Sequence, residues 1–170
     1  MPLISPKTLK IKPKAHERHE YSANIVWTGA RVGPTTSYQS YSREYEFRSG
    51  EKPVLRGSAD PHYRGDPTLY NPEDMLVVAL STCHLLSYLA DCARNGVHVV
   101  AYEDDASGVM EVKDGKLRFT EVTLRPRVTV AKGTNVEKAI AFHESAHDGC
   151  FVASSVNFPV RHEPTIVVAE

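Results

Sequence analysis

One stretch, residues 71–96, restricts the fold more than any other part of the sequence. Asn71 can cap a helix, Pro72 suits its first turn, and Asn95 with Gly96 mark its end. Between these signals apolar side chains occupy every side of the helix instead of one stripe, which is typical of a helix surrounded by protein. The pattern therefore predicts a buried central helix. Its Ser, Thr and His residues, together with its length, argue against a helix that spans a bilayer.

The segments around this helix alternate with a period of two and predict strands. The order is three antiparallel strands, the central helix, two strands, two helices and a last strand, which predicts an α+β fold with an antiparallel sheet packed on the buried helix. The expected strands cover 21–27, 41–48, 54–57, 97–112, 117–130 and 158–168; the later helices cover 135–147 and 150–156.

Bulk properties restrict the class of protein. The chain has 170 residues, a net charge of −1 and 24% charged residues, so neither nucleic acid nor a membrane surface is an expected partner. The start of the chain lacks the apolar run of a signal peptide, which predicts a reducing cytoplasm. Residues 1–18, rich in Pro and Lys, predict an N-terminal arm, and residues 19–170 predict a single domain.

Two of the three cysteines have sequence settings in which a thiol could be reactive. Cys83 lies in the apolar helix, where burial alone would leave it inert unless a cation lies nearby. Cys150 follows Gly149 at a predicted helix start, where free amides favour a thiolate. Cys92 follows Cys83 by nine residues, a rotation of about 180° around the helix, so it faces away from Cys83 and is expected to pack in the core. A packing role also remains open for Cys83 and Cys150.

Glu73 is the acidic residue of interest near the start of the central helix. It precedes Cys83 by about 15 Å of helix, so the two side chains need an intermediary, and a planar guanidinium can pair with a carboxylate while lying close to a thiolate. A plain role as a first-turn dipole partner is the alternative.

A competing pattern is H-E-x-x-H at His143, Glu144 and His147, the helical zinc-binding spacing of metallopeptidases. A zinc hydrolase needs a third ligand, and His162 and Glu163 are the downstream donors. An exposed helix face explains the same residues without a metal. No glycine pattern for nucleotides occurs, so nucleotide cofactors are not indicated.

Two motifs resemble the osmotically inducible protein C and organic hydroperoxide resistance (OsmC/Ohr) family. They are the N-P-E-x-x-L run at 71–76 leading to Cys83, and the segment 143–153 that contains Gly149 and Cys150. The resemblance covers about residues 19–168. It implies an OsmC-like fold, an intertwined homodimer with active sites at the subunit interface, and a thiol peroxidase that reduces organic hydroperoxides without haem, flavin or metal, so that no cofactor is expected.

The resemblance also implies roles for individual residues. Cys83 is similar to the peroxidatic cysteine, Cys150 to the resolving cysteine, and Glu73 to the carboxylate that holds an arginine over the thiolate. Arg31 in the turn 28–31 is similar to that arginine, with Arg43 and Arg64 as alternatives. The thiolate would become a sulfenic acid and then a Cys83–Cys150 disulfide, which a dithiol such as dihydrolipoamide or a lipoylated protein would reduce.

The sequence departs from the family pattern immediately after the first cysteine. Members usually carry an aromatic residue there, whereas this chain has His84, a change that bears on access to Cys83 and on its pKa. A non-enzymatic dimer that binds a small apolar ligand beside its thiols is the second hypothesis from a different class.

Overall fold

A computed structural model gives the α+β fold of residues 18–170, so the predicted arm lies outside the described residues except for Arg18. The described chain forms two compact units, residues 18–76 and residues 77–170. The single domain expected over residues 19–170 stays a prediction.

The unit 18–76 contains a three-stranded antiparallel sheet in the order β1-β2-β3, which confirms the three strands predicted before the central helix. In β1 and β2, Trp27 pairs with Tyr45, and the Trp27 indole N–H donates to the carbonyl of Ser42 at 2.8 Å. A Cβ on Gly29 would lie 2.2 Å from that same carbonyl oxygen, so the turn after β1 requires glycine. The elements are β1 Asn24–Trp27, β2 Tyr45–Arg48, β3 Leu55–Gly57 and the short 3₁₀ helices η1 Gly29–Arg31 and η2 Pro61–Tyr63.

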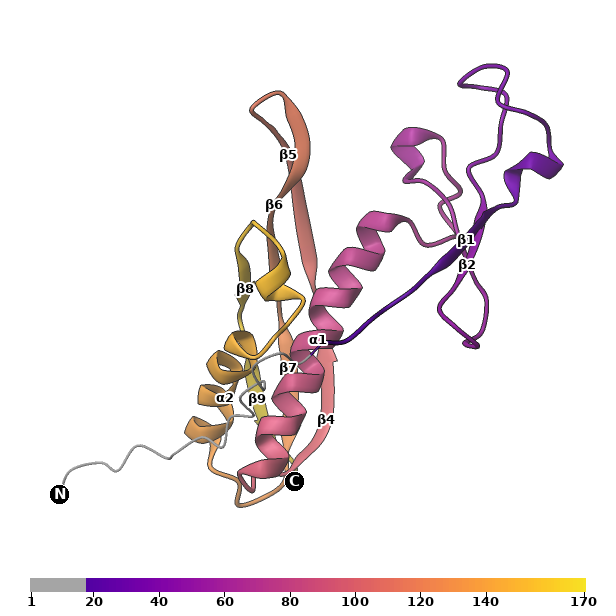
Figure 1. Cartoon of the computed structure of the whole chain (residues 1–170). Coiled ribbons are helices and arrows are strands. Elements are labelled where there is room, and N and C mark those ends of the chain that lie inside the picture. Colours follow the sequence, from indigo (N-terminus) through magenta and orange to yellow (C-terminus); the bar gives the residue numbers. More distant parts are fainter. Residues whose placement is uncertain (1–17) are drawn as a thin grey trace. The chain divides into compact units, whose positions relative to one another are not determined.

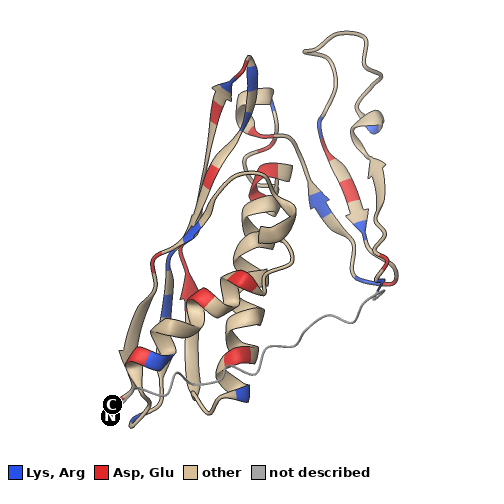
Figure 2. Cartoon of the chain, turned by 60° about the vertical axis from the view of Figure 1, so that its left-hand side comes forward, with Lys and Arg blue, Asp and Glu red and all other residues tan. Residues whose placement is uncertain are grey.

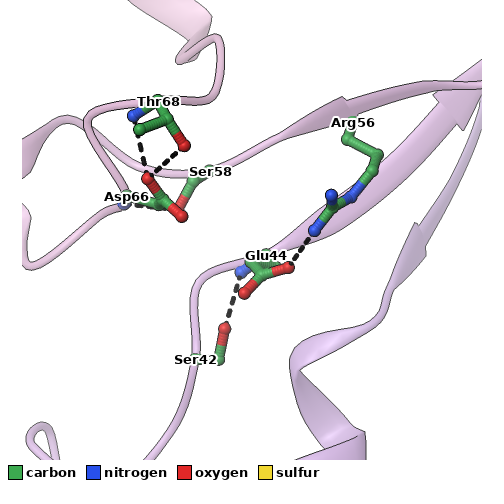
Figure 3. A network of polar contacts seen from close by, with 6 residues as sticks. All are labelled: Ser42, Glu44, Arg56, Ser58, Asp66 and Thr68. Atoms are coloured by element: carbon green, nitrogen blue, oxygen red, sulfur yellow. Dashed lines mark hydrogen bonds and ion pairs between the residues drawn. The ribbon is translucent and has the colours of Figure 1, made fainter.

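A polar network organises the loops of this unit (Figure 3). Arg56 on β3 pairs with Glu44 beside β2 at 2.7 Å. Asp66 accepts from the amide and hydroxyl of Thr68 at 2.8 and 2.7 Å, and its own amide donates to the Ser58 hydroxyl at 3.0 Å. These bonds, led by the Thr68 hydroxyl, hold the pKa of Asp66 below its ordinary value. The loop 58–70 is therefore ordered by its own short side chains.

Helix α1 spans Pro72–Arg94, and both predicted ends are confirmed. The Asn71 side chain accepts from the Asp74 amide at 2.7 Å, and the Asp74 carboxylate in turn faces the Asn71 amide at 3.4 Å, a reciprocal cap. Gly96 has a φ of +69°, the left-handed conformation that commonly ends a helix.

The prediction that protein surrounds α1 on every side is wrong for the single described chain, and for the expected homodimer it stays a prediction. Its buried side chains follow one face, whereas Val78 and Leu86 remain 53% and 67% exposed, because α2 and the strands of its unit cover one side of the helix. The buried residues are Leu80, His84, Tyr88, Asp91 and Cys92.

The expectation that α1 is too short to cross a bilayer is also wrong, since its 23 residues are long and apolar enough by length and composition alone. Figure 2 shows that its charges lie near the two ends. Its buried face nevertheless carries His84 and Asp91 into the protein, which is typical of a core helix.

In the unit 77–170, each long strand predicted after α1 is broken in two. A tight turn at Asp114 and Gly115, both with positive φ, joins β5 to β6 as predicted. Pro126 has no amide hydrogen to donate to a ladder, and the amide of Arg125 donates at 2.6 Å to Asp104 instead of to a strand. The strands are β4 Val99–Asp104, β5 Ser107–Lys113, β6 Lys116–Leu124 and β7 Pro126–Val130.

The last predicted strand is likewise divided, into β8 Val160–His162 and β9 Thr165–Val168, around Glu163 and Pro164. Two three-stranded sheets result, β4-β7-β9 and β5-β6-β8. The prediction of an antiparallel sheet is wrong here, because β8 and β9 run parallel to β6 and β7. A crossover that contains α2 returns the chain in the same direction, as parallel pairing requires.

Helix α2 spans Val136–Asp148, capped by Asn135, whose side chain accepts from the Lys138 amide at 2.7 Å. Figure 1 shows α1 and α2 along the strands of this unit. The core that they share contains Tyr88, Cys92, Val97, Val128, Val130, Ala139, Phe142 and Ala146. The short helix predicted from Cys150 is limited to the 3₁₀ turn η3 Ala153–Ser155.

Candidate redox site

The structure brings Cys83 and Cys150 together within the unit 77–170. Cys83 is half-buried on α1, Cys150 follows the end of α2 and is 1% exposed, and the two thiols lie within hydrogen-bonding reach of each other. Both cysteines are free thiols. Two sulfurs far apart in the sequence therefore meet, as disulfide formation requires.

Burial controls the acidity of Cys150. Burial, followed by the neighbouring Cys83, raises the pKa of this thiol to about 11, although the Ala153 amide that donates to the sulfur at 3.4 Å opposes the shift. Cys150 lies before η3 instead of in a regular helical turn, so the expected thiolate stabilisation by a helix start is outweighed. At neutral pH Cys150 is protonated, and the more accessible Cys83 is the thiol that a reagent would reach first.

Cys92 belongs to the core, as predicted. It is 1% exposed, it packs with Tyr88 and Val128, and burial raises its pKa to about 11. It is a matched control for experiments on the other two thiols.

Glu73 lies at the start of α1 in the unit 18–76, where it lines a cavity of about 440 Å³. Its Oε2 atom is buried without a hydrogen-bond partner among residues 18–170, and so is the Tyr45 hydroxyl that lines the same cavity. Burial, followed by the nearby Glu73 carboxylate, raises the pKa of Tyr45. The cavity walls are Trp27, Thr35, Tyr41, Arg43, Tyr45, Ser58, Ala59, Asp60, Tyr63, Pro72 and Glu73.

The three candidate arginines have different surroundings. The Arg43 guanidinium lies over the rings of Tyr38 and Tyr41, 4.7 and 3.9 Å from their centroids, and donates to the backbone carbonyls of both. Arg31 is exposed in η1, and Arg64 is exposed just after η2 with a φ of 67°. Within the described part of the chain none of the three forms an ion pair with Glu73, and Arg43 is held by its own loop.

The sequence patterns did not reveal a buried histidine cluster beside the cysteines. His84 Nε2 and His143 Nδ1 are hydrogen-bonded at 3.0 Å, and the ring of His162 on β8 lies 5.5 Å from that of His84 and 5.6 Å from that of His147. A detectable signal was the i, i+4 spacing that places His84 on the same face of α1 as Leu80 and Tyr88.

Burial determines the charge of this cluster. Burial, followed by the nearby His162 and His147, lowers the pKa of His84 to about 4. Burial, followed by the nearby His84 and His162, lowers that of His143 to about 3. The histidine pair is therefore neutral at pH 7.

The H-E-x-x-H pattern does not form a zinc centre in the described chain. His143 is fully buried against His84, whereas the Glu144 side chain is 80% exposed and faces His162 at 3.7 Å. Among residues 18–170 no three His, Cys, Asp or Glu side chains are arranged to hold a metal ion. The zinc hydrolase hypothesis thereby loses its structural basis, and an exposed helix face does not describe His143 either.

Comparisons with known proteins agree with this architecture. An OsmC-like protein of unknown function from Vibrio cholerae is 31% identical, with a TM-score of 0.80 over 87% of this chain and 100% of that one. Organic hydroperoxide resistance proteins from Elizabethkingia anophelis and Bacillus subtilis share the fold at 15% and 17% identity. Their TM-scores are 0.65 and 0.57, over 91% and 86% of this chain and 100% and 98% of theirs.

Among curated proteins, the uncharacterized protein YmaD of Bacillus subtilis is 21% identical over 89 residues, 51% of this chain. The chain spans 59% of the length of that relative. The OsmC-like protein family itself matches residues 65–165, which include Glu73, both reactive-cysteine candidates and the histidine cluster. The chain therefore belongs to the OsmC-like protein family.

Proposed function

We propose that this protein is a thiol peroxidase that reduces organic hydroperoxides to alcohols. The observation that carries the proposal is the contact between the Cys83 and Cys150 thiols, supplied by two separate elements of one unit. Organic hydroperoxide resistance proteins among the structural neighbours and the family resemblance support the choice of substrate class.

The chemistry balances with two thiols and one hydroperoxide. The Cys83 thiolate attacks the distal peroxide oxygen, the O–O bond breaks, and the alcohol leaves with a proton while Cys83 becomes a sulfenic acid. The Cys150 sulfur then displaces water from that sulfenic acid and forms the disulfide. A dithiol reduces the disulfide and is itself oxidised; dihydrolipoamide or a lipoylated protein is the proposed reductant.

The exposures of the two sulfurs support this division of labour. Half-buried Cys83 can receive a peroxide, whereas Cys150, 1% exposed and with its pKa raised to about 11, is kept protonated until the sulfenic acid forms beside it. The exposed apolar residues Val78 and Leu86 on α1 support the further proposal of a homodimer, since a second copy would bury them. We place the protein in the reducing cytoplasm, where both thiols persist.

The direct test is oxidation of the fully reduced protein with one equivalent of cumene hydroperoxide. We expect two of the three thiols per chain to disappear, one equivalent of alcohol to form, and a Cys83–Cys150 linked peptide to appear by mass spectrometry. Cys92→Ala should behave in the same way. Survival of all three thiols after the peroxide is added, or a linkage through Cys92, would contradict the peroxidase.

We assign thiolate activation to Arg31 and propose that it pairs with the Glu73 carboxylate during the reaction, since the described residues contain no such ion pair in the resting chain. Glu73 has a buried oxygen that lacks a partner in the described residues, Arg43 is occupied by Tyr38 and Tyr41, and the resemblance points to Arg31. We expect Arg31→Gln to slow the oxidation of Cys83 by about 10²-fold, because a cation stabilises both the thiolate and the charge on the leaving oxygen.

The control for this prediction is Arg64→Gln, which removes another exposed arginine of the same unit. Stopped-flow peroxide consumption separates the two variants: Arg64→Gln should retain the wild-type rate, and Arg31→Gln should be about 10²-fold slower. Equal rates for Arg31→Gln and the wild type would remove Arg31 from the mechanism.

The second candidate is a non-enzymatic dimer that binds a small ligand. The aromatic-walled cavity of about 440 Å³ favours it, because this volume falls within the range of small-molecule sites. It becomes the better description if the reduced protein consumes no hydroperoxide.

A further inference from the structure

The contact between α1 and α2 includes two hydrogen bonds, one turn apart on each helix. The Tyr88 hydroxyl donates to the Ala139 carbonyl at 3.1 Å, and His84 Nε2 is bonded to His143 Nδ1 at 3.0 Å. The His143 ring also stacks on the Tyr88 ring with centroids 3.9 Å apart. Residue 84 pairs with residue 143 and residue 88 with residue 139, so the two helices run antiparallel. The part of α1 that contains Cys83 therefore lies near the C-terminal end of α2, which leads to Cys150.

The histidine pair is a costly way to join two helices. His84 and His143 are 1% and 0% exposed, and their remaining nitrogens, Nδ1 and Nε2 respectively, have no partner among the described residues. Two apolar side chains of similar volume would fill the same space without burying these polar atoms. A hydrogen bond, however, has a preferred direction and length that apolar contacts lack.

The directional hydrogen bond between His84 and His143 lies close in sequence to both cysteines. His84 directly follows Cys83, and α2, which carries His143, ends two residues before Cys150. A disulfide requires its Cβ atoms at about 3.5–4.5 Å, so a shift of α1 along α2 by one residue, about 1.5 Å, would separate the sulfurs.

We propose that the His84–His143 hydrogen bond is a positioning device that keeps α1 in register with the end of α2, so that the Cys83 sulfenic acid meets Cys150. The inference rests on the proposed function. It gives a role to His84, the residue after Cys83 at which this chain departs from the family pattern. His84 and His143 are positioning residues, since they are 1% and 0% exposed and act on the reaction only through the placement of the two cysteines.

The third element at this contact is β8. The His162 ring lies 5.5 Å from that of His84 and 6.1 Å from that of His143, and His162 Nε2 faces Glu144 at 3.7 Å. The imidazole ring of His162 packs against the rings of His84 and His143. The hydrogen bond between the two helices is made by His84 and His143 alone among these three.

The test separates the two chemical steps in single-turnover experiments. In His84→Leu we expect oxidation of Cys83 within about twofold of wild type but closure of the disulfide slowed about tenfold or more, since small misplacements of reacting groups are costly. Dimedone should then trap the Cys83 sulfenic acid, and sulfinic acid should accumulate at excess peroxide.

Two further variants make the test specific to the hydrogen bond. His84→Gln keeps a donor at the position of Nε2 and should restore closure to within about threefold of wild type, a rescue that a purely structural filler would not show. Tyr88→Phe removes the other bond between the helices and should leave closure within about twofold.

The outcomes distinguish the inference from the proposed function. Normal closure in His84→Leu, or failure of His84→Gln to restore it while Tyr88→Phe slows it equally, would overturn the positioning role. If His84→Leu fails to fold, the double variant His84→Leu/His143→Leu, which leaves no unpaired imidazole, provides the same comparison. Absence of any disulfide in the oxidised wild type would instead overturn the peroxidase.

Discussion

Cys83→Ser is expected to lose hydroperoxide reduction by about 10³-fold or more, because no other described group can take its place as the nucleophile. A serine hydroxyl is not ionised at neutral pH, and its oxygen cannot form a sulfenic acid. Cys150 cannot replace Cys83 as the nucleophile, because it is only 1% exposed and its burial raises its pKa to about 11. The measurement is consumption of tert-butyl hydroperoxide with dihydrolipoamide as the reductant.

Cys150→Ser should behave differently from Cys83→Ser in the same assay. Its first turnover should proceed at the wild-type rate, because the attacking sulfur is intact, and later turnovers should fail as Cys83 stays oxidised. Cys92→Ala, which removes a core thiol, should keep full turnover. Sustained peroxide reduction by Cys83→Ser would exclude the mechanism, and a lost first turnover in Cys150→Ser would reverse the roles of the two cysteines.

The ends of α1 and the first three strands could be predicted from local signals, whereas the breaks in the later strands and their parallel pairing could not. Asn71 and Gly96 mark α1 at both ends because caps depend on a few adjacent residues. The break between β6 and β7 involves a partner that is distant in sequence, the Asp104 carboxylate that accepts from the Arg125 amide. Parallel pairing of β6 with β8 likewise follows from the path of the chain through α2.

In the candidate site, too, features set by local sequence could be predicted and contacts between distant segments could not. The identities of Cys83, Cys150 and Glu73 could be taken from motifs, because motif spacing is a local property. The contact of the two sulfurs and the bond between His84 and His143 arise where α1 meets α2, which no local pattern encodes. The H-E-x-x-H pattern misled because periodicity does not tell whether His143 faces solvent or another helix.

Acidification is expected to destabilise the fold through the same histidine pair. Folding lowers the pKa of His84 from 6.5 to about 4 and that of His143 from 6.5 to about 3. Between these values and pH 6.5 the unfolded chain binds more protons than the folded one, so the free energy of unfolding falls as pH falls. The contribution is complete above pH 6.5.

The size of this effect is large enough to measure by urea denaturation at fixed protein concentration. Each histidine contributes about 1.4 kcal/mol per pH unit inside its window, so the pair should cost about 2–3 kcal/mol between pH 6 and pH 5. Burial also lowers the pKa of His162, which adds to the effect, although Glu144 opposes that shift. Carboxylates titrate mainly at lower pH and contribute little in this interval.

Variants isolate the pair from the other histidines. The double variant His84→Leu/His143→Leu should flatten the dependence between pH 6 and pH 5, because no buried imidazole of the pair remains to be protonated on unfolding. His98→Gln, at an exposed position, should keep the wild-type slope. A double variant with the full wild-type slope would mean that the acid sensitivity arises elsewhere and that His84 and His143 bind protons in the folded protein as readily as in the unfolded chain.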